Sequence, residues 1–227
     1  MGRRASTRLP TRLRPANFFE ALLSAAGGVI VPDRTGLVRG IDVASYQPTD
    51  LTALIRQHSA SHVVVKLYQS VENIGGRTTG AQHSAAQLAS ALANGCTAGG
   101  YIWAYGSRDP RVSVRDGISL ARSCGVELPV LWLDIEEYPS DHSIPNSIWI
   151  ETALDECAVQ GVRGGIYSGR YVWQKIGSPA FPGVPLWTAD YNERPDLDVP
   201  VYGGMELVGH QFTSTPVDQS VYLPAVV

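Results

Sequence analysis

The sequence predicts an α/β fold built as a TIM-type barrel, and three observations lead to this prediction. Short apolar segments alternate with helix-like segments about every 30 residues, which is typical of right-handed βαβ units around a parallel sheet. Up to eight such strands fit into roughly 190 residues, which favours a compact barrel over a doubly wound sheet. The last three strands lie too close together for full helices between them, so the closing third of the barrel is expected to be irregular.

The first half of the chain supplies four strands and three helices. The second strand is rich in β-branched residues, and the second helix is rich in Ala, Gln and Leu until Asn94-Gly95 stops it. The expected strands are Val38–Val43, His62–Tyr68, Ala98–Ala104 and Pro129–Glu136. The expected helices are Asp50–His58, residues 80–94 and Val112–Cys124.

The second half supplies the remaining strands and two helices. Pro145 lies near the start of a helix over Asn146–Gln160, and Gly161 ends it. A short helix is expected around Arg170–Ile176. The expected strands are Gly164–Ser168, Pro185–Asp190, Glu206–Thr213 and Val217–Tyr222.

One barrel domain is expected over residues 37–227, preceded by an Arg-rich extension over residues 1–36. Five arginines precede the first acid, Glu20, and the remaining 13 basic residues face 21 acids, so the body carries a net charge of about −8. So acidic a body argues against nucleic acid as the main ligand. Because Glu20 interrupts the apolar stretch of the extension and no cleavage pattern is present, a short helix or docking arm is preferred to a secretory signal.

The sequence gives no indication of a metal, a cofactor or a membrane span. The three cysteines show no CxxC spacing, which predicts free thiols rather than a disulfide framework or a zinc site. The five histidines show no metal-ligand spacing, and no apolar run approaches 18 residues. Any chemistry is therefore expected to come from side chains.

A pair of acids stands at the end of the fourth predicted strand. Successive side chains of a strand point to opposite faces, so Asp134 and Glu136 are expected on one face, with Ile135 packed on the other. Two partly desolvated carboxylates that repel each other keep at least one proton near neutral pH, which suits general acid catalysis. The alternative is a strand that simply emerges into solvent and carries surface acids. Glu137, on the opposite face, is expected to be structural.

Other acids and many aromatic residues fall at equivalent strand ends. Asp42 ends the first strand, Asp190 ends the sixth, and Asp218 lies in the last segment. In a parallel barrel, the carboxyl ends of the strands open on the face that holds the active site. The aromatic residues near these ends are Tyr46, Tyr68, Tyr101, Trp103, Tyr105, Tyr138, Tyr167, Trp187 and Tyr191. Acids above aromatic rings suit sugar chemistry, because rings stack on pyranoses and carboxylates protonate glycosidic oxygens.

Six segments, in order, resemble the family 25 glycoside hydrolases, the lysozyme-like muramidases of bacteria and phages. They begin with Gly40-Ile41-Asp42-Val43-Ala44-Ser45-Tyr46-Gln47, Leu131-Trp132-Leu133-Asp134-Ile135-Glu136 and Gly165-Ile166-Tyr167-Ser168. They continue with Leu186-Trp187-Thr188-Ala189-Asp190-Tyr191, His210-Gln211-Phe212-Thr213-Ser214 and Val217-Asp218-Gln219-Ser220-Val221-Tyr222. The resemblance covers about residues 39–223, and it is carried by the order and spacing of the motifs.

The resemblance implies a modified TIM-type barrel of the (β/α)5(β)3 kind. It also implies hydrolysis of the β-1,4 bond between N-acetylmuramic acid and N-acetylglucosamine in bacterial peptidoglycan. Glu136 would be the general acid, Asp134 would assist it, and Asp42 and Asp218 would support the pair. Substrate-binding side chains are expected at Tyr68, Gln69, Tyr101, Trp103, Tyr167, Trp187, Asp190 and Gln211.

The sequence departs from the family pattern at two strand ends. Gln69 stands where the family usually has a cleft glutamate, and Ile102-Trp103 replaces the usual His-Phe after Tyr101. These departures support an alternative, a catalytically weak or inactive barrel that serves as a cell-wall-binding or phage virion structural module. A chitinase-like hydrolase fits less well, because only Asp134 and Glu136 match its longer acidic motif. Residues 1–36 are a candidate docking arm for virion or tail proteins. Without a clear signal peptide, the protein is expected to reach the wall by phage release, in the virion or by another export route.

Overall fold

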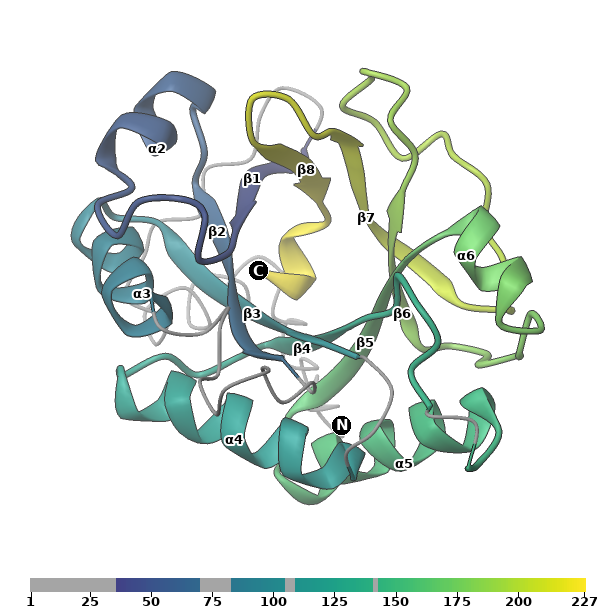
Figure 1. Ribbon diagram of the computed structural model, residues 1–227. Coiled ribbons are helices and arrows are strands. Elements are labelled where there is room, and N and C mark those ends of the chain that lie inside the picture. The colour runs from purple at the N-terminus through teal and green to yellow at the C-terminus, as the bar shows by residue number, and fades with distance from the viewer. Residues whose placement is uncertain (1–35, 70–82, 105–108, 141–142) are drawn as a thin grey trace, which may run out of the picture.

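The computed structural model describes residues 36–69, 83–104, 109–140 and 143–227. Eight strands form a closed barrel in sequence order. They are β1 (Val38–Val43), β2 (His62–Gln69), β3 (Thr97–Trp103), β4 (Val130–Asp134), β5 (Arg163–Gly169), β6 (Pro185–Ala189), β7 (Glu206–Thr213) and β8 (Asp218–Tyr222). The predicted TIM-type barrel is thereby confirmed, and Figure 1 shows the strands around a common axis.

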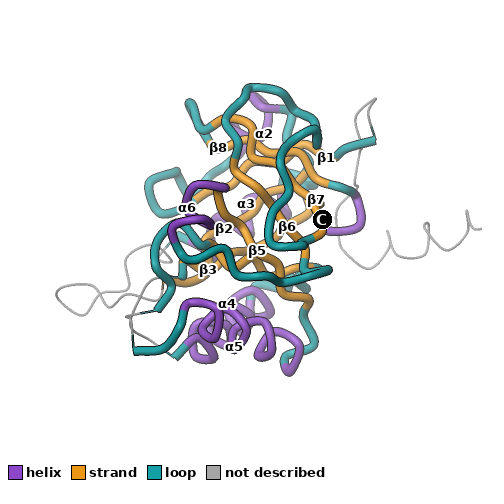
Figure 2. Tube along the Cα trace, turned by 90° about the vertical axis from the view of Figure 1, so that its right-hand side faces the viewer, coloured by secondary structure: helices purple, strands orange, loops and turns teal. Residues whose placement is uncertain are grey.

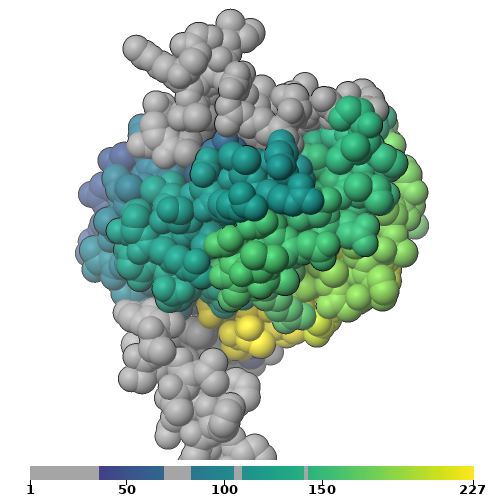
Figure 3. Space-filling view, turned by 90° about the horizontal axis from the view of Figure 1, so that it is seen from below, coloured from purple at the N-terminus to yellow at the C-terminus, as the bar shows by residue number. Residues whose placement is uncertain are grey.

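Helices cover only part of the barrel, as the short spacing of the last strands predicts. They are α2 (Thr52–His58), α3 (Ser84–Ala93), α4 (Pro110–Ser123), α5 (Asn146–Val159), α6 (Arg170–Lys175) and the 3₁₀ turn η1 (Pro224–Val226). Figure 2 shows α4 and α5 together below the strands, and their side chains form much of the face seen in Figure 3. They are joined by a bidentate pair in which Arg115 Nε and Nη2 lie 2.8 and 3.0 Å from the carboxylate of buried Glu156.

The direction of the last strand differs from the all-parallel pattern. β1 to β7 are parallel to their sequence neighbours, whereas β8 is antiparallel to both β7 and β1. Only the short connection Ser214–Val217 separates β7 from β8, and a connection this short permits only an antiparallel neighbour. The amino end of β8 therefore lies beside the carboxyl ends of the other strands.

The barrel interior is filled by large rings packed against glycines. Its apolar cluster consists of Val64, Tyr101, Val130, Trp132, Tyr167, Trp187, Val208, Tyr222 and Val226. A Cβ atom on Gly165 would lie 2.6 Å from the Trp132 ring and 2.8 Å from Val130, and one on Gly40 would lie 2.8 Å from the Tyr222 ring. These glycines make room for an aromatic layer across the barrel.

Replacing Gly165 with alanine is expected to destabilise the fold by about 1–3 kcal/mol, the usual cost of overpacking a filled core. The Trp132 ring is fully buried and cannot withdraw from the added methyl group. Urea unfolding followed by tryptophan fluorescence measures the change. Gly169→Ala on the same strand is the matched control, because its added Cβ would meet nothing closer than 3.8 Å. Equal stability of the two variants would contradict this account of the packing.

Candidate active site

Four acids converge where the strands open on one face of the barrel. Asp42 lies near the end of β1, Asp134 ends β4, and Asp218 begins β8. Asp42 and Asp218 are direct partners in the antiparallel β1–β8 register. Glu136 is close enough to influence the proton affinity of all three other acids. The structure thus brings together the four acids that the sequence analysis selects.

The acid pair of the fourth strand is less regular than predicted. β4 ends at Asp134, so the expectation of one strand through Glu136 is wrong by two residues. Ile135 is fully buried, as predicted, and its N–H donates to the Tyr167 carbonyl at 2.9 Å. Because Glu136 follows on a bend, it is exposed at the rim while Asp134 is buried. Glu137 points to Lys175, whose Nζ lies 3.3 Å from its carboxylate, in keeping with a structural role.

Burial raises the pKa of every acid in the cluster, and repulsion by a neighbouring carboxylate adds to each shift. Burial raises the pKa of Asp42 and of Asp134 well above the ordinary value, and neighbouring carboxylates add to both shifts. Asp134 Oδ1 is buried and has no hydrogen-bond partner within the described part of the chain. The pKa of Asp218 rises to about 6, first through burial and then through Glu136. The pKa of Glu136 is raised as well, mainly because surrounding protein displaces water. The site therefore holds protons at a pH where surface acids have lost theirs.

Lys66 is a charged neighbour of the four acids. The sequence analysis does not include it among the site residues. Its side chain is only 5% exposed, and its Nζ lies 4.4 Å from the centroid of Trp103 and 5.9 Å from that of Tyr101. Burial lowers the pKa of Lys66, while Asp134 and Glu136 raise it. The signal was available in the strand HVVVKLY, where Lys66 shares a face with the barrel-interior residue Val64.

A chain of hydrogen bonds fixes Asp42 from the other side. The Tyr167 hydroxyl donates to Gln211 Oε1 at 2.6 Å, and Gln211 Nε2 donates to Asp42 Oδ2 at 3.0 Å. Tyr167 also packs against Trp187, with the ring centroids 4.4 Å apart and the ring planes tilted by 53°. Trp187 Nε1 in turn donates to Ser220 Oγ at 3.1 Å. Since both rings and the amide are buried, they form the support beneath the acids.

The other expected substrate-binding residues occupy different places. Tyr101 belongs to the barrel interior and Trp103 lies at the end of β3 under Lys66, so both border the acids. Tyr68 follows a bulge in β2 and packs in the core between the sheet and the helices. Asp190 follows β6, and its N–H donates to the Gln211 carbonyl. The backbone of Gln69 pairs with β3, whereas its side chain, like Tyr105 and most of the extension 1–36, lies outside the described residues.

Replacing Asp218 with asparagine is expected to stabilise the fold at neutral pH while impairing the site. A folded-state pKa raised from 3.8 to about 6 means that the fold loses stability as pH rises through this range. At 1.4 kcal/mol per tenfold change in proton affinity, and with a discount because Asp218 is partly exposed, the cost above pH 6 is on the order of 1–2 kcal/mol. Thermal unfolding at pH 7 should therefore show a melting temperature higher by several degrees, with no gain at pH 3.5. An equal gain at both pH values would contradict the assignment.

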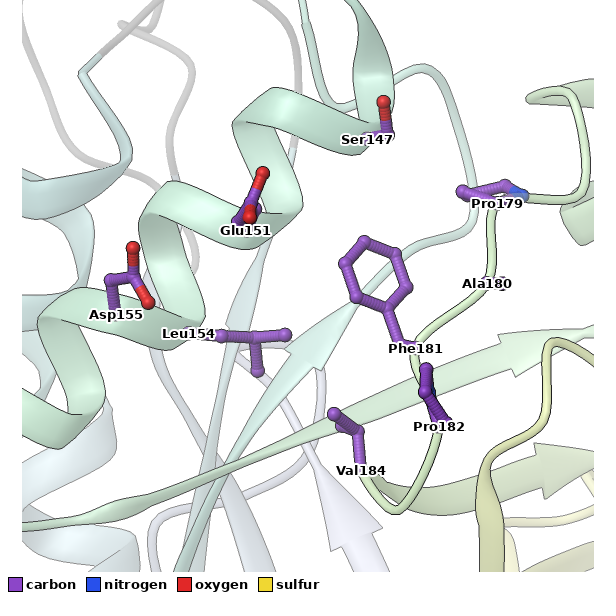
Figure 4. A pocket seen from close by; sticks show the side chains of 9 residues that line it. All are labelled: Ser147, Glu151, Leu154, Asp155, Pro179, Ala180, Phe181, Pro182 and Val184. Atoms are coloured by element: carbon purple, nitrogen blue, oxygen red, sulfur yellow. The ribbon is translucent and has the colours of Figure 1, made fainter.

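A hollow lies on the outside of the barrel, away from the acid cluster. Figure 4 shows it between α5 and the segment that leads to β6. It is lined by Ser147, Glu151, Leu154, Asp155, Pro179, Ala180, Phe181, Pro182 and Val184. Glu151 and Asp155 lie one helical turn apart on one wall, and the Phe181 ring forms the other. Its residues come from none of the strand ends that carry the acids.

The two buried histidines and the three cysteines of the described residues lie outside the acid cluster. His62 and His210 are buried and hydrogen-bonded to Thr97 and to backbone carbonyls, respectively. Cys96, Cys124 and Cys157 are free, and burial raises the pKa of Cys157 to about 12. Over the described ranges, no group of three or more His, Cys, Asp or Glu side chains is arranged so that it could hold a metal ion. No described helix has the length and apolar character needed to cross a membrane.

Comparison with known proteins places this site in a family. Residues 41–221 match the family model described as glycosyl hydrolases family 25. The fold is similar to that of a glycosyl hydrolase 25 of Streptococcus pneumoniae, the virulence factor GHIP, with a TM-score of 0.63 and 17% identity over 82% of this chain and 87% of that one. It is also similar to the catalytic domain of endolysin ply40 from Listeria monocytogenes bacteriophage P40, with a TM-score of 0.60 and 21% identity over 84% and 95%. No curated protein matches the chain.

A third similar structure is larger. The modular autolysin LytC of Streptococcus pneumoniae, solved in complex with a synthetic peptidoglycan ligand, has a TM-score of 0.63 and 19% identity. The match covers 82% of this chain and 46% of that one, so the present chain corresponds to about half of the autolysin. Because the family model spans the barrel from β1 to β8 and includes all four acids, the chain belongs to the glycosyl hydrolases family 25.

Proposed function

We propose that this protein is a muramidase of the lysozyme class, which hydrolyses the β-1,4 bond between N-acetylmuramic acid and N-acetylglucosamine in bacterial peptidoglycan. The observation that carries the proposal is the pairing of exposed Glu136 with buried Asp134 inside one acid cluster of a family 25 barrel. Two carboxyl groups in unlike surroundings are what glycoside hydrolysis requires.

Glu136 is the general acid of the proposed mechanism. It stands at the rim, where a glycosidic oxygen can reach it, and its raised pKa keeps it protonated at higher pH than a surface glutamate. It gives this proton to the leaving oxygen as the bond breaks. As a carboxylate, it then takes a proton from the water that completes hydrolysis, in accord with microscopic reversibility.

Asp134 stabilises the positive charge that develops on the sugar. Its buried Oδ1 has no protein partner in the described residues, and nearby Lys66 favours its ionised form. The charge can develop on the ring itself or on the acetamido group of the substrate, because substrate assistance is an established exception to the two-carboxylate scheme. Asp42 and Asp218 bind sugar hydroxyls and adjust the proton affinities of the pair.

The similarity to an endolysin and an autolysin supports peptidoglycan as the substrate. An endolysin and an autolysin share the fold, and the autolysin was solved with a synthetic peptidoglycan ligand. The active protein would then work at the bacterial cell wall, reached by release from a phage-infected cell or from a virion. The Arg-rich residues 1–36 remain a candidate docking arm for virion proteins, which a pull-down with and without these residues would test.

The direct test is incubation with purified peptidoglycan, followed by measurement of new reducing ends and identification of the terminal sugar. Reducing ends on N-acetylmuramic acid support the muramidase, and reducing ends on N-acetylglucosamine indicate a different bond. Sedimentation with the wall without any release would instead favour the second candidate, a wall-binding or virion module. The observation that favours this second candidate is the presence of Gln69 and Trp103, which depart from the family pattern at the strand ends beside the acids.

A further inference from the structure

His210 of β7 occupies an unusual hydrogen-bonding position. Its side chain is fully buried, and both ring nitrogens face backbone carbonyl oxygens of the loop between β6 and β7. Nδ1 lies 2.6 Å from the Asp196 oxygen, and Nε2 lies 2.7 Å from the Asp190 oxygen. One imidazole therefore bridges two carbonyls that are six residues apart in the chain.

The two contacts can both be hydrogen bonds in only one protonation state. A carbonyl oxygen only accepts, and a neutral imidazole has one N–H donor and one bare nitrogen. A neutral His210 would set a nitrogen lone pair against an oxygen lone pair at hydrogen-bonding distance. The imidazolium donates from both nitrogens, and distances this short are typical of charge-assisted bonds.

The loop that receives these bonds lacks a helix of its own. Asp190 to Met205 join β6 to β7 through turns, such as Asn192 N–H to the Asp190 carbonyl at 2.7 Å. One main-chain bond from the loop to the sheet comes from Glu193, whose N–H donates to the Phe212 carbonyl with φ at +59°. A loop built from turns needs side-chain bonds to hold its shape, and His210 supplies two at its base.

This loop carries an aromatic residue to the acid cluster. Tyr191 is 54% exposed, it interacts with the Tyr167 side chain, and its pKa is raised by burial and by Asp218, Glu136 and Asp42. Gln211, the neighbour of His210 in β7, points the other way and donates to Asp42. Two consecutive residues thus serve the site from opposite faces of one strand.

We propose that His210 is a doubly protonated, buried cation that pins the β6–β7 loop and thereby positions Tyr191 at the rim of the acid cluster. Its ring is a positioning group, because it lies on the outer face of β7 and does not reach the reacting atoms. With one ring proton missing, one of the two attractive contacts would become repulsive, so holding the loop requires both N–H donors. The effect on Tyr191 as a substrate-contacting residue rests on the proposed function.

No ion pair joins His210 to a carboxylate within the described residues, although the loop around its ring carries Asp190, Arg194 and Asp196. The register partners of His210 are Thr188 on β6 and Val221 on β8, neither of which titrates. The centroid of the Phe212 ring lies 6.3 Å from that of the His210 ring. In the loop, the Asp196 carboxylate lies 3.9 Å from Arg194 Nε and accepts from the Asp198 N–H. The hydrogen-bond partners of the His210 ring in the described residues are therefore the two carbonyls.

The protonation state is tested by ¹⁵N NMR of histidine-labelled protein, and His62 is a built-in control. His62 is equally buried, but its Nδ1 faces only the Thr97 hydroxyl, its Nε2 has no partner, and burial lowers its pKa to about 3. From its two carbonyl contacts, we expect both nitrogens of His210 to be protonated in the folded protein, and one nitrogen of His62 to be bare. A bare nitrogen on His210 throughout the pH range of the folded protein would overturn the proposal.

The contribution of His210 to holding the β6–β7 loop is tested with the variant His210→Gln. His62→Gln, the same change at a buried site in a different strand, is its control. Loss of a charge-assisted bond should speed amide hydrogen exchange across residues 190–198 by about tenfold in the first variant and not in the second. On peptidoglycan, His210→Gln should raise KM several-fold with little change in kcat. Unchanged exchange in His210→Gln would refute the pin. The hydrogen-exchange and NMR measurements need no substrate. An inactive wild-type protein would therefore refute the proposed function, while these two measurements would still decide whether His210 holds the loop.

Discussion

Replacing Glu136 with glutamine is expected to lower the rate of glycan cleavage by about 10³-fold, within the range that general acid catalysis contributes. The amide has nearly the shape of the carboxyl group but cannot give a proton to the leaving oxygen. Since Glu136 is exposed on a bend after β4, its loss should leave the fold intact. Release of reducing ends measures the rate, and sedimentation with peptidoglycan measures binding, which we expect to persist.

Glu137→Gln is the matched control for this variant. It makes the same chemical change one residue along, and the side chain that it alters pairs with Lys175 on the outer surface. An exposed pair of this kind contributes little to stability, so activity and melting temperature should stay near those of the wild type. Full activity of Glu136→Gln would exclude Glu136 as the acid. Equal losses in both variants would show that the segment, rather than the carboxyl group, was disturbed.

Replacing Lys66 with methionine is expected to shift the pH–activity profile to higher pH. The ammonium lowers the pKa of both Asp134 and Glu136, so its removal raises them both. On the acidic limb of the profile, more of Asp134 is then protonated and unable to stabilise a cation, and activity there should fall by about tenfold. The alkaline limb moves upward too, because Glu136 keeps its proton longer. The full pH profile of reducing-end release measures both limbs.

Lys175→Met controls for the loss of a lysine that lies over an aromatic ring. Its Nζ is 4.9 Å from the Tyr138 ring centroid, a contact like that of Lys66 with Trp103, but it is 40% exposed and lies on the outer surface. We expect its pH profile to match that of the wild type. A profile of Lys66→Met that falls uniformly, without moving along the pH axis, would mean that Lys66 acts through packing instead of charge.

The sequence was sufficient to predict the barrel because its evidence is local. The alternation of β-branched strands with helical segments is a property of short windows, and the helix stops at Asn94-Gly95 and Gly161 are single-residue signals. The expected helices and strands accordingly differ from the observed ones by a few residues. The four acids could be selected because they share strand ends, and strand ends share a face.

What the sequence could not provide depends on register and on distant partners. A two-residue period places Asp134 and Glu136 on one face only if the strand continues, and it ends at Asp134. Lys66 reads as an ordinary strand lysine until β2 closes against β3 and brings Tyr101 and Trp103 beneath it. The bond from Gln211 to Asp42 spans 169 residues, and no local pattern indicates such a pairing.

The antiparallel β8 makes barrel closure and completion of the acid cluster a single event. Its pairing with β1 aligns Asp42 with Asp218, the two ends of a very long chain segment. Contacts between such distant residues carry the largest loop-closure entropy and form late in folding. Until β8 docks, β1 and β7 are open edges and one acid is missing. In a refolding experiment, the rate at which catalytic activity returns would therefore report the docking of β8, the last step of barrel closure. Circular dichroism and fluorescence would record the earlier formation of the other strands.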